Sequence, residues 1–268
     1  MKHNKFTDNL CIILVFLFLF LPIAVLILFS FNTSKLNIVF EGFTLHWYKD
    51  LFQNTALLEA LRNTLIVASI STILSTIIGT ISAYGMHKFD FPLKKVVNEL
   101  LYIPVVIPEI VLGISLLSIY TLLKLELGMF TLILAHISFS IPYVIISVRS
   151  VLENMDPNLE KAASDLGASK LKTFFYIIIP SLMPGIMSGA QLAFTLSLDD
   201  VVISYFTAGP DSITLPQYVY SIIKTGVTPD VNAMITIMLG IIFIILTTSI
   251  IINLRRLKQE VERWKEKY

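Results

Sequence analysis

The chain has 268 residues, of which 55% are hydrophobic and 15% charged, and its mean hydropathy is +0.79. An ordinary soluble domain is about 45 to 50% apolar and about 25% charged, so this composition is that of a membrane protein. A formal charge of +1 excludes a basic nucleic-acid-binding surface and an acidic disordered tail. The single cysteine, Cys11, excludes an internal disulfide.

Six long apolar stretches predict six transmembrane helices in an all-α membrane protein, since a spanning helix needs about 20 mostly apolar residues. The stretches cover residues 10–31, 63–86, 100–123, 127–148, 174–198 and 231–254. The first is interpreted as a retained anchor, because its apolar part is about twice as long as that of a cleaved signal peptide. Six spans put both termini on one side, which carries fifteen Lys and Arg residues against five on the other. Both termini are therefore predicted to be cytoplasmic.

The third stretch contains Pro104, Pro108 and Glu109. A charge near the middle of the bilayer costs about 2.5 to 3.5 kcal/mol, so Glu109 should not face lipid. The two prolines predict a kink where Glu109 enters the span. A kinked helix with an acid suggests a cation pathway or a gate, or equally a structural pair with His136 or Lys124. His136 by itself is predicted to be a buried polar residue with satisfied hydrogen bonds.

Two adjacent acids, Asp199 and Asp200, follow the fifth stretch at its predicted outer end. Acids at a helix C-terminus oppose the macrodipole, which weakens a purely structural explanation for them. Together the two carboxylates favour the binding of cations at the outer end of this span. The alternative is a pair of solvated interface residues.

Small residues recur every four positions in two of the stretches, which marks faces where helices approach closely. Packing against a neighbouring helix is favoured over lining a pore. The two stripes are Ser71, Ser75, Gly79 and Ala83, and Gly185, Gly189, Ala193 and Ser197.

The predicted cytoplasmic loop, residues 153–172, contains signals for a short helix. Asp156 and Pro157 are typical of a helix start, and Gly167 of a position just after a helix end. Between them a single apolar stripe is formed by Leu159, Ala162, Ala163 and Leu166. About ten residues do not hold a helix in water, so this one needs a partner surface. That surface is either the lipid headgroups or a protein groove, and the two alanines favour the groove.

This loop resembles the Glu-Ala-Ala loop in the membrane subunits of ATP-binding-cassette (ABC) importers. The resemblance rests on Ala162 and Ala163, Gly167, Ile177 and Pro180. The family's glutamate before the alanines is Lys161 here, with Glu160 one place earlier, and Ile179 replaces the usual leucine.

The resemblance implies a type I ABC permease fold in a single transmembrane domain, residues 1–268. It also implies a coupling helix that docks on a cytoplasmic ATPase through Leu159, Glu160, Ala162, Ala163, Leu166 and Gly167. The chain has no Gly-x-x-x-x-Gly-Lys phosphate loop, so it is not the ATPase. ATP and Mg are then bound by the partner, and no cofactor or metal is expected in this chain.

Three further segments resemble the second membrane subunit of the polyamine (spermidine and putrescine) importers. They are residues 104–113, 194–204 and 226–233, and the resemblance extends from about residue 5 to residue 255. It implies a bacterial plasma-membrane complex of two similar permeases, a pair of ATPase subunits and an extracytoplasmic polyamine-binding protein. Substrate would pass by alternating access.

A linear polycation needs carboxylates for its ammonium groups and aromatic faces for its methylenes. Candidates for this path are Glu109, Asp199, Asp200, Tyr102, Tyr205 and Phe206. A permease for another solute, such as ferric ion or a small anion, is the alternative within the class, although these acids have the wrong sign for an anion. A secondary transporter would need no docking helix, and a membrane enzyme would need a catalytic motif that the sequence lacks.

Overall fold

The computed structural model describes residues 5–34, 39–222, 229–244, 247–248 and 251. Within these ranges the regular structure is helical, apart from one isolated bridge between Asn32 and Phe43. The chain divides into two compact units. Unit 1 comprises Met1–Leu58 and Ile222–Tyr268, and unit 2 comprises Glu59–Ser221. Each unit is described by itself.

Unit 1 holds the helix α1 (Lys5–Phe29), the short helix α2 (His46–Leu51) and an apolar helix, Pro229–Ile244. The indole Nε1 of Trp47 donates to the carbonyl of Asn32 at 2.6 Å and so ties α2 to the bridge. Its two chain segments meet where Asn54 Nδ2 donates to Asp230 Oδ2 at 2.8 Å. Of the predicted span 231–254, residues 245–246, 249–250 and 252–254 lie outside the described residues.

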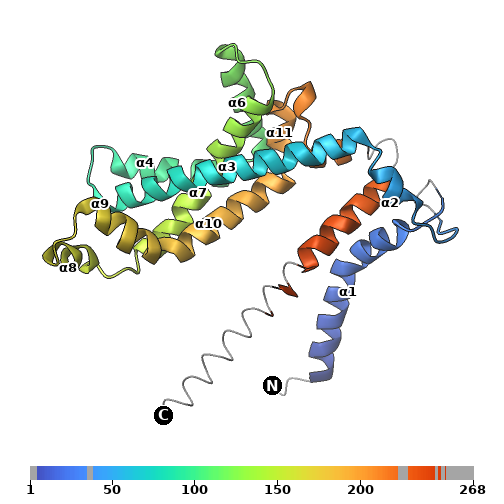
Figure 1. Ribbon diagram of the computed structural model, residues 1–268, viewed down its shortest axis with the longest axis horizontal. Helices are drawn as coiled ribbons and strands as arrows, with labels where there is room; N and C mark the ends of the chain where they lie inside the picture. The colour runs from blue at the N-terminus through green and yellow to red at the C-terminus, as the bar shows by residue number, and fades with distance from the viewer. Residues whose placement is uncertain (1–4, 35–38, 223–228, 245–246, 249–250, 252–268) are drawn as a thin grey trace. The chain divides into compact units, whose positions relative to one another are not determined.

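Unit 2 is built on three long helical segments (Figure 1). They are α3 (Thr55–Lys88), α7 (Met129–Leu152) and a continuous segment of α9 (Lys170–Thr173), the π-helical η1 (Phe174–Ile178) and α10 (Ile179–Asp199). Their shared core is formed by Ala83, Val144, Ile145, Val148, Leu152, Ile178, Leu182 and Ala193. A small-residue face on each of α3 and α10 allows α7 to pack between them.

Both small-residue stripes are packing seams, as the sequence predicted. A Cβ placed on Gly79 of α3 would lie 2.7 Å from the Val144 side chain of α7. One placed on Gly189 of α10 would lie 3.0 Å from the Val144 backbone. Only glycine allows these approaches without displacing a neighbour, and the other six members of the two stripes are also buried.

The predicted third span, residues 100–123, is broken into separate helices rather than kinked. It contains α5 (Ile103–Val106) and α6 (Glu109–Leu122) and is preceded by α4 (Lys94–Leu100), with a bend of 111° between Lys94–Val106 and Glu109–Leu122. Pro108 lacks an N–H and disfavours helical backbone before it, and Ile107 is accordingly extended. The bend separates α5 from α6 and makes Glu109 the first residue of a new helix.

Four shorter elements complete unit 2. They are α8 (Leu159–Asp165), α11 (Val202–Thr207), the 3₁₀ helix η2 (Pro210–Ser212) and α12 (Leu215–Ile222). In Figure 1, α8 lies beside α9 at one end of the unit, away from α6 and α11. Over the whole described part of the chain, four helices have the length and apolarity to cross a membrane, or five spans if the bent pair is one.

Candidate functional site

The segment predicted to dock on another protein forms the helix α8. It ends in a Schellman motif, in which Gly167 N–H donates to Ser164 O at 2.9 Å and Ala168 N–H to Ala163 O at 3.0 Å. Gly167 has a φ of +81°, which favours glycine. The start differs slightly from the prediction, because Asp156 closes a turn by accepting from Asn158 N–H and the helix begins at Leu159.

The apolar stripe of α8 is divided between two directions. Ala163 is buried and Leu159 half-buried, so these two side chains face the rest of unit 2. Ala162 is exposed, and Leu166 is 89% exposed. Together the two side chains form a small exposed apolar surface.

Glu160 turns back onto α3. Its Oε1 accepts from the Tyr84 hydroxyl at 2.8 Å, and its Oε2 forms an ion pair with Lys88, whose Nζ also lies 2.7 Å from the Tyr84 hydroxyl. Burial acts to raise the pKa of Glu160, but the hydrogen bonds from Lys88 and Tyr84 and the charge of Lys88 outweigh it, so the pKa lies below its ordinary value. The carboxylate is engaged within its own chain, while the neighbouring Lys161 is exposed.

The second region lies at the far end of the 30-residue helical segment Lys170–Asp199, which is about 45 Å long at 1.5 Å per residue. Asp199 is the last residue of α10 and is exposed. Asp200 is 8% exposed, and its carboxylate accepts from Ile203 N–H at 3.1 Å and from Ser204 N–H at 2.7 Å. It therefore caps the start of α11, where the macrodipole favours a negative charge. Asp200 therefore has a structural role at the start of α11, although its position directly after α10 indicated an acid that opposes a helix macrodipole.

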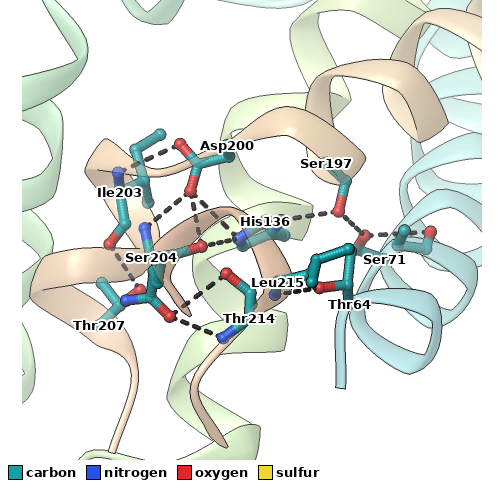
Figure 2. Close-up of polar contacts among 12 residues, drawn as sticks. Thr64, Ser71, His136, Ser197, Asp200, Ile203, Ser204, Thr207, Thr214 and Leu215 are labelled. Atoms are coloured by element: carbon teal, nitrogen blue, oxygen red, sulfur yellow. Dashed lines mark hydrogen bonds and ion pairs between the residues drawn. The ribbon is translucent and has the colours of Figure 1, made fainter. Parts of the chain in front are cut away.

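His136, on α7, connects this cap to α10 and α3 (Figure 2). Its Nδ1 lies 2.7 Å from Ser197 Oγ, and its Nε2 lies 3.0 Å from Ser204 Oγ and 3.5 Å from Asp200 Oδ2. Ser197 Oγ in turn lies 3.2 Å from Ser71 Oγ. All five side chains are buried, so the prediction of a buried, satisfied histidine is confirmed.

The protons of this network follow from its donors and acceptors. Ser204 donates its one hydroxyl proton to Asp200 Oδ2 at 2.7 Å, so it accepts from His136, and Nε2 carries the ring proton. In the neutral ring Nδ1 then accepts from Ser197, which accepts from Ser71. The result is a hydrogen-bond chain that runs from α3 to the Asp200 carboxylate. It fixes the break between α10 and α11.

The six residues predicted for a substrate path are not equivalent. Glu109 is exposed at the start of α6, the helix that packs against α11 through Gly113 and Phe206. Within the described ranges Glu109 forms no hydrogen bond or ion pair, so neither His136 nor Lys124 is its partner.

The three aromatic candidates also differ in position. Phe206 is half-buried and packs on Gly113 of α6, where an added Cβ would lie 2.6 Å from its ring. Tyr205 is 69% exposed, and its ring centroid lies 5.5 Å from that of Phe206. Tyr102 lies on the other side of the bend, before α5, and forms no ring contact with the other two in the described residues.

Sequence reasoning missed part of this region. Ser204 is the last residue of the segment 194–204 that carries the family resemblance, and Ser71 and Ser197 belong to the packing stripes. No spacing rule connected any of the three to His136. Tyr143 of α7, which packs against the buried cluster of Ala135, Phe139 and Ile203, carried no signal in the sequence. Among the described residues no group of three or more His, Cys, Asp or Glu side chains is arranged to hold a metal ion.

Solved structures share the fold at low sequence identity. A bacterial ABC transporter involved in the import of the acidic polysaccharide alginate matches with a TM-score of 0.69 at 14% identity, over 94% of this chain and 97% of the other. The MetNI methionine ABC transporter matches with a TM-score of 0.58 at 17% identity, over 72% and 92%. The chain is therefore an all-α membrane protein with the fold of an ABC importer permease.

The sequence places it more narrowly. Residues 75–263 match the family of binding-protein-dependent transport system inner membrane components, and the chain belongs to this family. It is 40% identical over 220 residues to the spermidine/putrescine transport system permease protein PotC of Escherichia coli K12, covering 82% of this chain and 83% of that protein. It is 39% identical over 224 residues to the putrescine transport system permease protein PotI of the same strain, covering 81% and 80%.

Family membership confirms several predictions. The chain is a multi-pass inner-membrane permease component and not an ATPase, and no cofactor is expected of it. It works as part of a binding-protein-dependent ABC transporter, together with an ATPase and a binding protein.

Proposed function

We propose that the chain is the permease subunit of an ATP-driven importer of spermidine and putrescine, and that it forms part of the translocation path by alternating access. The similarity to PotC and PotI supports this assignment over four-fifths of the chain. The observation that carries it in the structure is that three acids lie at helix ends in one part of unit 2. Glu109 begins α6, Asp199 ends α10 and Asp200 caps α11, and α6 packs against α11 through Gly113 and Phe206. A linear polycation is a ligand for such an acidic region.

In this proposal Glu109 and Asp199 contact the substrate, because both are exposed. At an effective dielectric constant near 20, a carboxylate 4 Å from an ammonium contributes about 4 kcal/mol before desolvation is subtracted. Asp200 adds its charge from a buried position and holds the start of α11. Tyr205 and Phe206 provide ring faces for the methylenes, with about 0.5 to 2 kcal/mol of cation–π stabilisation each. Tyr102, beyond the bend, is assigned to a later stage of the path.

The proposed topology has six spans, in a single domain of residues 1–268, with both termini in the cytoplasm. The distribution of Lys and Arg supports this orientation. It places the α8 end of unit 2 in the cytoplasm and the Asp199 end outside. Substrate would then meet the acidic region first, after release from an extracytoplasmic polyamine-binding protein.

Coupling to the ATPase is assigned to the loop 153–172. Ala162 and Leu166 form the contact surface, and Gly167 sets the end of the helix that carries them. Leu159, Ala163 and Glu160 attach α8 to the remainder of the permease, so movement of α8 is passed to α3. The complete transporter would contain a second homologous permease and a dimer of ATPase subunits.

Uptake of labelled spermidine and putrescine tests this function, in cells that lack only this chain and in cells where it is restored. We expect restoration to recover uptake of at least one of the two polyamines and to leave ferric ion uptake unchanged. Unchanged polyamine uptake, with the protein shown to be in the membrane with its ATPase, would reject the substrate and retain the permease fold.

A further inference from the structure

A cavity of about 120 Å³ opens in unit 2 at the α8 end, away from the acidic region. Its walls come from the last turns of α3, from α4 and from the end of α7. A buried water needs about 10 to 15 Å³ of such volume, so the cavity holds more than a few waters. The proposed function makes no use of it.

The cavity has an apolar floor and a polar rim. Ala83, Met86 and Ile145 form the floor, within the candidate spans. The rim carries Lys94 and Arg149, with Asn98, His87 and Glu153 beside them. The candidate spans of α3 and α7 end at Lys88 and Leu152, so the rim lies near the span ends, at the depth expected for lipid headgroups. The floor lies deeper along the spans, where Ala83 and Ile145 belong to the helix core.

Both rim cations keep donors for a ligand. Counting only partners in the part of the chain that the structure describes, Arg149 uses Nε on Glu153 at 2.9 Å and Nη1 on Asn98 at 3.3 Å, which leaves three of its five N–H groups. On the same count Lys94 donates to Phe89 O and to Asp90 Oδ1, both at 2.9 Å, which leaves one of its three N–H groups.

The partners of these two cations are weakly held. The Asp90 side chain is fully exposed and that of Glu153 is 59% exposed, so both ion pairs are of the weak, solvent-screened surface type. An incoming anion exchanges with such pairs at little cost.

We propose that this cavity binds the phosphate group of an anionic membrane phospholipid. The phosphate lies between Arg149 and Lys94, where a guanidinium fork matches its oxygens, and the glycerol and first methylenes lie on the apolar floor. Free phosphate shares the headgroup chemistry but has nothing to place on that floor. Basic pockets between spanning helices on the cytoplasmic side are suited to anionic headgroups.

The test uses the assembled transporter, purified with its ATPase and placed in nanodiscs of phosphatidylcholine with or without phosphatidylglycerol. Native mass spectrometry measures retained phosphatidylglycerol, and the unfolding midpoint measures its stabilising effect. Arg149→Gln and Lys94→Gln should each weaken retention about fivefold. This factor corresponds to the loss of about 1 kcal/mol, the contribution of one cation near an anionic membrane surface. Lys95→Gln is the matched control, because Lys95 is exposed on the same helix and does not line the cavity.

Three results would overturn the proposal. Retention could be unchanged in both rim variants, or it could fall equally in Lys95→Gln, which would indicate general surface electrostatics. Inorganic phosphate added to phosphatidylcholine nanodiscs could also reproduce the full stabilisation, which would assign the cavity to a free anion. Uptake of polyamine by the variants is measured separately, so failure here leaves the proposed function intact.

Discussion

Exchanging the charges of Lys88 and Glu160 tests whether Glu160 acts within its own chain. Both side chains are about one-third exposed, so their attraction is that of a surface pair, about 1 kcal/mol. Reversing one charge removes that attraction and adds a repulsion of similar size, about 2 kcal/mol in total. This lowers the ratio of attached to detached α8 roughly 30-fold.

We therefore expect Glu160→Lys and Lys88→Glu to depress ATP-dependent polyamine uptake strongly while the protein remains in the membrane. The double variant Lys88→Glu/Glu160→Lys should recover most of the uptake, because attraction is restored and the Tyr84 hydroxyl both donates and accepts. Lys161→Glu, which changes the exposed neighbour, is the comparison. If the double variant were no better than Glu160→Lys alone, Glu160 would be acting on another protein, and the internal tether would be rejected.

Four other predictions concern five residues. Asp199→Asn should raise the KM for spermidine uptake about tenfold with normal expression, whereas Asp200→Asn should cost about 1 to 3 kcal/mol of stability by disturbing a buried cap. His136→Phe should lower the unfolding midpoint more than His136→Gln, because phenylalanine leaves buried hydroxyls without a partner. Gly167→Pro should abolish uptake with the protein still in the membrane, since proline has neither the N–H nor the positive φ required. Glu160, whose pKa is depressed in the fold, should stabilise the protein above its ordinary pKa of about 4.3 and lose that effect as the pH falls through the folded value.

Each of these predictions has an outcome that contradicts it. Equal losses of expression in both aspartate variants would assign Asp199 a folding role. Equal midpoints for the two histidine variants would show that its hydrogen bonds contribute nothing. Normal uptake by Gly167→Pro would remove the docking helix from the mechanism. For Glu160, the stability difference between wild type and Glu160→Gln, followed from neutral to acid pH, should vanish in acid and would contradict the account if it grew.

The fold was predictable where one physical rule dominated. Hydropathy located the long helices, and the four-residue spacing of small side chains identified seams that α7 occupies. The prolines indicated a distortion before Glu109, but its size depends on tertiary packing, and a bend of 111° was not predictable from Pro108 alone. The start of α8 shifted because the Asp156 side chain favours a turn over the first helical turn.

The candidate site was less accessible from sequence. Asp199 and Asp200 are adjacent in the chain, yet one is exposed and the other is a buried cap, because the helix ends between them. In the hydrogen-bond chain through His136, one bond alone joins residues 126 positions apart, which no local pattern encodes. Glu160 was placed on the correct helix, but its engagement with α3 depends on how the loop returns to the helix end.

Polyamine import by this chain is best measured as ATP-dependent uptake into proteoliposomes that contain the complete transporter, its binding protein and labelled spermidine or putrescine. We expect uptake that requires ATP, the binding protein and this chain, and that falls when Glu109→Gln or Asp199→Asn is introduced into an otherwise intact complex. Uptake of neither polyamine by a complex that binds and hydrolyses ATP would show that the chain is not a polyamine permease.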